Sequence, residues 1–97
     1  MAVEIESIRH KALRRFVEGG KPRGLDAKAV DRLRKMIAYL AAINRVEELY
    51  MPPNWGAHEL TGDRAGTWSL TVTKNWRMTF RITEDGAVAD LDLEDYH

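Results

Sequence analysis

The sequence predicts an α+β domain in which N-terminal helices pack on one face of a small antiparallel β-sheet. Two observations indicate this class. Apolar residues recur at helical spacing in the first half of the chain, and after Pro52 and Pro53 they alternate with polar residues, as in half-buried strands. A chain of 97 residues can bury one modest core. We therefore expect a single domain over residues 1–97.

The helices are expected before the proline pair. The spacing of apolar residues predicts a first helix over roughly 10–18, which a glycine pair ends. Asp26 is a good N-cap for a second helix, and Asn44 with Glu47 predicts a capped helical turn that continues through Leu49. The second helix is amphipathic, and its apolar face is expected to hold Val30, Leu33, Ile37, Leu40 and Ala41.

The strands are expected after the proline pair, and their alternation separates a core face from a polar face. They are predicted at 67–73, 76–82 and 87–93, with shorter ones near 57–60 and 3–7. Trp68 and Trp76 share the parity of the apolar residues, which favours core packing over base stacking. The opposite, uncovered face would then show Ser69, Thr71, Arg77, Thr79 and Arg81.

Charge is distributed unevenly along the chain although the formal net charge is zero. Residues 1–35 contain ten Lys or Arg against five acids, whereas residues 81–97 contain one base against six acids. A basic block can follow the backbone of a polyanion, although both blocks are also compatible with solvated faces of an ordinary domain. With no apolar stretch near the ~20 residues of a membrane span and no cysteine, we expect a cytoplasmic protein without membrane contact or thiolate chemistry.

Several side chains have the chemistry needed to cleave RNA without a metal. Such cleavage requires a base for the 2′-hydroxyl, an acid for the 5′-oxygen, and cations for the phosphate, and histidine and arginine supply these functions near neutral pH. His58, His97, Arg64 and Arg77 are the candidates. A metal site built from His58, His97 and Asp95 is disfavoured because these residues lack a helical ligand spacing. His10, among helix arginines, is assigned no chemistry, and no cofactor is expected.

Three stretches together are similar to those of the HigB branch of the RelE-like bacterial toxins: "SIRHKALRRF", "HELTGDRAGTWSLTVTKNWRMTFR" and the final "LEDYH". The resemblance extends over essentially the whole chain. It implies a RelE-like fold and a toxin that enters the ribosomal A site and cuts messenger RNA during translation. It also implies a HigA-type antitoxin with a helix-turn-helix domain, so that operator DNA would be bound only through that partner.

The resemblance carries site residues over position by position. The matching catalytic positions are His58, Arg77, Asp95, Tyr96 and His97. Cations expected to bind RNA are Arg64, Lys74 and Arg81 on the sheet side and Lys11, Arg14 and Arg15 on the first helix. Attack of the 2′-hydroxyl on the adjacent phosphate would leave a 2′,3′-cyclic phosphate and a 5′-hydroxyl end.

One position departs from the family pattern. Thr61 stands where many relatives carry a lysine, and a threonine can donate a hydrogen bond but cannot neutralise a phosphate. Either Arg64 or Lys74 replaces that charge, or cleavage is weaker in this protein. The departure keeps an alternative open, in which the chain is a binding module that acts mainly through its antitoxin complex in transcriptional autoregulation.

Overall fold

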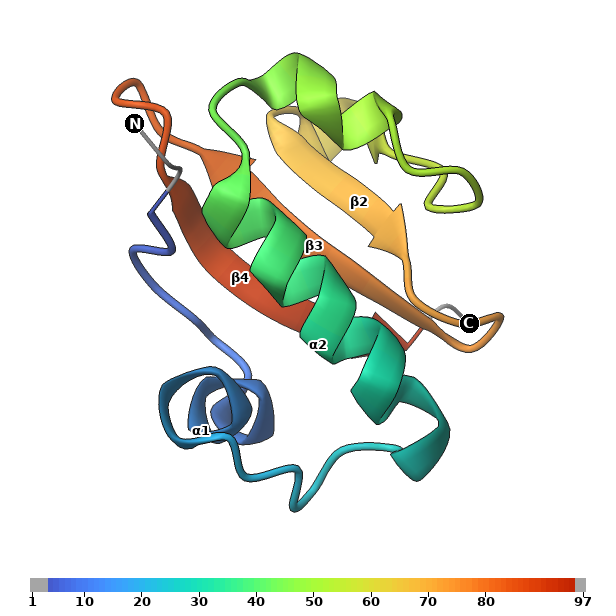
Figure 1. The fold of residues 1–97 in the computed structure, drawn as a ribbon. Coiled ribbons are helices and arrows are strands. Elements are labelled where there is room, and N and C mark those ends of the chain that lie inside the picture. Colours follow the sequence, from blue (N-terminus) through green and yellow to red (C-terminus); the bar gives the residue numbers. More distant parts are fainter. Residues whose placement is uncertain (1–3, 96–97) are drawn as a thin grey trace.

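The computed structural model describes residues 4–95 and shows two α-helices packed against a four-stranded sheet (Figure 1). The helical half contains α1 (Lys11–Gly19), α2 (Ala27–Ala42) and the 3-10 helix η1 (Val46–Tyr50). The sheet half contains β1 (His58–Glu59), the 3-10 turn η2 (Gly62–Arg64), β2 (Thr67–Thr71), β3 (Trp76–Ile82) and β4 (Val88–Asp95). All neighbouring strands are antiparallel, in the order β1-β2-β3-β4. The predicted fold class is therefore confirmed.

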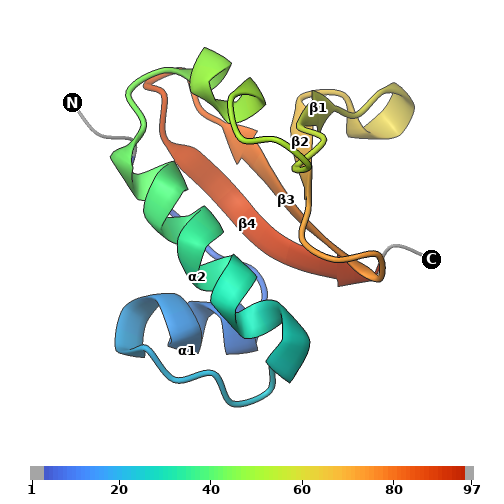
Figure 2. The same ribbon diagram turned by 45° about the vertical axis from the view of Figure 1, so that its right-hand side comes forward.

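Both helices lie on the same side of the sheet, with α2 along the face and α1 beside α2 (Figure 2). This side contains the core, which joins apolar residues of the helices to the apolar face of the strands. Trp68 is buried and Trp76 packs half-buried against the core, as their parity predicted. The most enclosed members, none more than 1% exposed, are Leu13, Ala29, Leu33, Met36, Leu40, Leu49, Leu70, Val72, Met78, Phe80, Val88 and Leu91.

Side chains cap the starts of both α-helices. The Asp26 carboxylate accepts a hydrogen bond from the backbone N–H of Lys28 at 2.9 Å, which confirms the predicted N-cap. His10 is the N-cap of α1, where its Nδ1 accepts from the N–H of Leu13 at 3.2 Å. His10 thus has a structural role at the start of α1.

The expected capping pair before the helical turn is wrong by one residue. Glu48, not Glu47, reaches back to accept from the backbone N–H groups of Asn44 and Arg45, at 2.6 and 2.9 Å. The turn begins at Val46 after the N-cap Arg45, so its third residue is Glu48. These backbone hydrogen bonds lower the pKa of the Glu48 carboxyl.

The segment before α1 lies beside β4 instead of forming a full strand over 3–7. Its described part makes two isolated parallel bridges, Ile5 with Val88 and Ile8 with Leu91. Between these bridges β4 has an irregular register with β3, and Asp90 has a positive φ of 55°. The N–H of Asp90 donates to the hydroxyl of Ser7 at 2.8 Å, so the irregular residue is tied to the N-terminal segment.

The strand ends also differ from the prediction. β2 stops at Thr71 because the N–H groups of Val72 and Thr73 both point to the carbonyl of Trp76 across the turn. β4 continues two residues beyond the predicted end, to Asp95. Within residues 4–95, no helix has the length and apolar character needed to cross a membrane.

Candidate active site

The sheet face turned away from the helices carries the predicted polar residues in two cross-strand rows. His58, Ser69, Thr79 and Asp92 are direct neighbours from β1 to β4. The second row lies two residues away on each strand and consists of Thr71, Arg77 and Glu94. Residues directly opposite one another in antiparallel strands project to the same face. The register therefore gathers His58, Arg77 and Glu94 on one surface, which we call the polar face.

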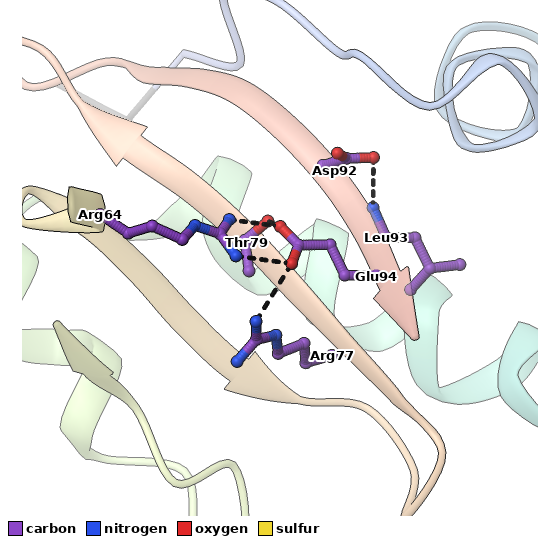
Figure 3. Close-up of polar contacts among 6 residues, drawn as sticks. All are labelled: Arg64, Arg77, Thr79, Asp92, Leu93 and Glu94. Carbon is purple, nitrogen blue, oxygen red and sulfur yellow. Dashed lines mark hydrogen bonds and ion pairs between the residues drawn. The ribbon is translucent and has the colours of Figure 1, made fainter. Parts of the chain in front are cut away.

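Glu94 is at the centre of the polar face (Figure 3). Its carboxylate receives a bidentate pair of hydrogen bonds from Arg64, at 2.8 and 2.5 Å. Nη2 of Arg77 donates to Oε1 at 3.2 Å, and the hydroxyl of Thr79 donates to Oε2 at 2.5 Å. Since an ionised carboxylate offers about four lone-pair positions, these four bonds use its full acceptor capacity.

The surroundings of Glu94 favour its ionised form. The hydrogen bond from Arg64, with smaller contributions from Thr79 and Arg77, lowers the pKa of Glu94 to about 2. The same interaction raises the pKa of Arg64. Glu94 is therefore a carboxylate at every pH near neutrality, and both predicted phosphate-binding arginines already contact an anion.

This network corrects the expectation of an uncovered polar face. Thr79 and Ser69 are only 2% and 1% exposed, although both project away from the helices. Arg64 extends from η2 over the middle of the sheet to Glu94, with Arg77 beside them (Figure 3). The Ser69 hydroxyl is buried and makes no hydrogen bond to any other described residue. The middle of this face is a layer of side chains, and its cations are accessible mainly through Arg64.

His58 lies exposed at the β1 edge, with its ring oriented by its own loop. Nδ1 is 2.8 Å from the carbonyl oxygen of Gly56. Because a carbonyl oxygen can only accept, the ring proton is assigned to Nδ1, and in the neutral imidazole the lone pair is then on Nε2. The local structure thus presents a histidine whose outer nitrogen can accept a proton.

The other predicted catalytic residues lie at or beyond the end of β4. Asp95 pairs with Trp76, one position beyond the Arg77–Glu94 pair. It therefore projects to the same side of the sheet as Trp76, opposite to the side of Glu94. It is exposed at the end of the strand, next to the β2–β3 turn that contains Lys74. Tyr96 and His97 lie outside the described residues, and their site roles remain predictions.

The remaining predicted cations are dispersed. Arg81 lies four residues along β3 from Arg77. Its Nη1 forms an ion pair with Oδ2 of Asp90 at 3.7 Å. It lines a small cavity of about 50 Å³ together with Arg9, Arg64, Asp90, Asp92 and Glu94. Lys11, Arg14 and Arg15 are exposed on α1, in the helical layer, so the structure does not bring them to the polar face.

The turn that contains Arg64 begins directly after the departing position Thr61. Thr61 is exposed at the N-cap of η2 and makes no side-chain capping bond there. Gly62 follows with φ of 69°, a conformation that a side chain would strain. The Glu59 carboxylate accepts from the N–H of Gly66 at 3.2 Å and closes this loop at its other end. The turn that aims Arg64 at the sheet is therefore locally defined.

Sequence reasoning missed Glu94 and Arg9. Glu94 alternates with the apolar residues of β4 in the same way as Asp92, so the sequence does predict that it points away from the core. Its partners, however, lie 15, 17 and 30 residues away, and which of them it meets depends on the sheet register. Arg9 lines the small cavity beside Arg81 because its backbone N–H donates to the carbonyl of Leu91 in β4. Within residues 4–95, no group of three or more histidine or acidic side chains is arranged to hold a metal ion.

Comparison with known proteins identifies the family. The chain is 38% identical over 93 residues to the Endoribonuclease HigB of Proteus vulgaris, covering 96% of this chain and 99% of the relative. Among solved structures it is similar to YafQ from E. coli strain BL21(DE3), with a TM-score of 0.55 and 13% identity over 96% of this chain and 94% of the other. It is also similar to a YoeB/ParE toxin from Agrobacterium tumefaciens, with a TM-score of 0.58 and 16% identity over 95% and 99%.

The two structural similarities establish a shared fold, while the family is established by sequence. A family model described as the RelE-like toxin of the type II toxin-antitoxin system HigB matches residues 6–97. That match includes the loop from His58, the polar face and the end of β4. With the full-length curated relative, it shows that this chain belongs to the HigB family of RelE-like type II toxins.

Proposed function

We propose that this toxin is an endoribonuclease that cuts messenger RNA in the A site of the translating ribosome and so inhibits translation. The observation that carries the proposal is the placement of His58, with an acceptor Nε2, on the same sheet face as Arg64 and Arg77. The name of the Proteus vulgaris relative, an endoribonuclease, supports the same activity.

The proposed reaction needs no metal. Nε2 of His58 takes the proton of the 2′-hydroxyl, whose oxygen attacks the adjacent phosphorus, and His97 gives a proton to the departing 5′-oxygen. The products are a 2′,3′-cyclic phosphate and a 5′-hydroxyl end. Arg77 and Arg64 stabilise the negative charge that develops on the phosphate oxygens. Asp95 orients a neighbouring histidine or arginine, and Tyr96 stacks on a base.

The partners follow from the same proposal. The exposed α1 cations Lys11, Arg14 and Arg15, together with Lys74 and Arg81, contact RNA of the ribosome and the message. The type II family implies an antitoxin, which we propose is a HigA-type helix-turn-helix protein that alone contacts operator DNA. The toxin then acts in the cytoplasm, where its ribosomes are.

The experiment is primer extension on a defined messenger RNA held in a translating ribosome. Wild type should cut at the A-site codon, His97→Ala should not, and the same RNA without ribosomes should stay intact. A chelator selective for transition metals, which leaves the ribosomal magnesium in place, should not change the wild-type rate. No cleavage by folded wild-type protein would favour the alternative, a binding module active through its antitoxin complex in autoregulation, for which Thr61 is the specific reason.

A further inference from the structure

The Glu94 carboxylate lies between the two guanidinium groups that the proposed function assigns to the RNA backbone. Arg64 engages both of its oxygens, and Arg77 engages one of them. A guanidinium fork recognises carboxylate and phosphate oxygens with the same planar geometry. An RNA phosphate that approached the same edge of Arg64 would therefore compete with Glu94 for both of these donors.

The three partners differ in their freedom to rearrange. Glu94 and Arg77 are cross-strand neighbours in the paired part of β3 and β4, and their side chains are only 21% and 23% exposed. Arg64 comes from the three-residue turn η2, and its side chain is 43% exposed. Arg64 is thus the partner that can leave Glu94 with the least disturbance of the sheet.

The Arg64–Glu94 pair is open to exchange from the Arg64 side. The Arg64 side chain is 43% exposed, so water and salt reach the pair and screen its attraction. A phosphate oxygen presented to Arg64 offers a comparable interaction, so exchange of one anion for the other costs little. The negative charge of Glu94 stays nearby after the exchange and repels the phosphate.

We propose that Glu94 is an internal competitor of RNA phosphate, a carboxylate that holds Arg64 and Arg77 in a closed pair until the RNA backbone displaces it. The inference rests on the proposed function, because it takes the polar face as the RNA site. It adds that Glu94 sets the affinity for single-stranded RNA and reduces the number of ions released on binding. Free RNA is consequently a weak ligand, although the arginines are held in place to receive a phosphate.

The test measures the binding of a labelled single-stranded 2′-O-methyl oligonucleotide, which lacks the attacking hydroxyl, at several salt concentrations. Glu94→Gln removes the charge and keeps an amide of the same shape. We expect roughly five- to tenfold tighter binding at low salt for this variant. Each phosphate contact contributes a slope of about 0.7 to the fall of log affinity with log salt for single strands, so release of Arg64, the more exposed arginine, should steepen the slope by about 0.7.

Matched variants separate competition from a general gain of charge. Glu84→Gln adds the same single charge on the exposed turn between β3 and β4, breaks no contact between Glu94 and the two arginines, and should leave the slope at the wild-type value. Glu94→Asp keeps the charge but is one methylene shorter. It should retain Arg77 and release Arg64, and so steepen the slope by about 0.7, one phosphate contact. This variant keeps the test decisive if Glu94→Gln does not fold.

The outcomes distinguish this inference from the proposed function. Wild-type slopes and affinities in both Glu94 variants, or an equal gain in Glu84→Gln, would overturn the competition, as would absence of binding by every protein at the lowest salt. Cleavage of ribosome-held messenger RNA by the wild type is measured separately. If it occurs while the Glu94 variants bind like wild type, the nuclease stands and the role of Glu94 does not. If it fails while the slopes change as expected, the reverse holds.

Discussion

Arg64 and Glu94 lie 30 residues apart in the sequence, yet they form a bidentate ion pair that ties the turn before β2 to the last strand of the sheet. The pair passes over the middle of the polar face, where Thr79 donates to Glu94 and is only 2% exposed. The turn η2, which its own hydrogen bonds define locally, is thereby also held in position relative to β4. This relationship connects the stability of the domain to the placement of its candidate phosphate ligands.

The first prediction concerns acid stability. The pKa of Glu94 is about 2 in the folded protein against 4.5 for an ordinary glutamate, so its stabilisation is complete above pH 4.5 and is lost as the pH falls toward 2. The full shift would correspond to about 3 kcal/mol, and because Arg64 is 43% exposed we expect about 1–2 kcal/mol. Urea unfolding of Glu94→Gln should show this loss at pH 7 and little difference from wild type at pH 2. The exposed Glu84→Gln is the control, and an equal effect there would contradict the assignment to Glu94.

The second prediction concerns the two histidines within the described residues. His58→Ala should lower ribosome-dependent cleavage by about 10²–10⁴-fold, the usual contribution of a general base, without unfolding the protein, because the ring is exposed. His10→Ala should instead lower the free energy of unfolding by about 1 kcal/mol through loss of the α1 cap, with cleavage retained. Primer extension and thermal unfolding measure the two effects. Wild-type cleavage by His58→Ala would remove it from the mechanism.

The sequence predicted features that depend on nearby residues, and it did not predict features that depend on how distant segments pair. The cap at Asp26 and the burial of Trp68 depend on neighbours a few residues away and on strand parity, so both were predicted. The choice between Glu47 and Glu48 failed because it depends on where a 3-10 turn starts. The Glu94 network depends on the register of β3 with β4 and on the direction of η2, which no local pattern encodes.

The third prediction concerns the two buried hydroxyls of the polar face, those of Ser69 and Thr79. Ser69 is buried without a hydrogen bond to another described residue, so Ser69→Ala should leave the free energy of unfolding unchanged or raise it by up to about 1 kcal/mol. Thr79→Val removes a bond to the ionised Glu94 and should lower that free energy by about 1.5–3 kcal/mol. Urea titration of both variants checks the contrast. A loss in Ser69→Ala as large as in Thr79→Val would mean that the Ser69 hydroxyl also stabilises the fold.

The fourth prediction concerns Thr61, three residues before Arg64 on the exposed start of η2. Glu94 already engages Arg64 and Arg77, so a lysine at position 61 would supply a cation that can meet RNA phosphate without first leaving a carboxylate. Thr61→Lys should therefore raise ribosome-dependent cleavage several-fold at low salt. Ala65→Lys, on the other side of Arg64 in the same loop, adds the same charge as a control. An equal gain in Ala65→Lys would reduce the effect to general attraction, and no cleavage by either variant or by wild type would support the binding-module alternative.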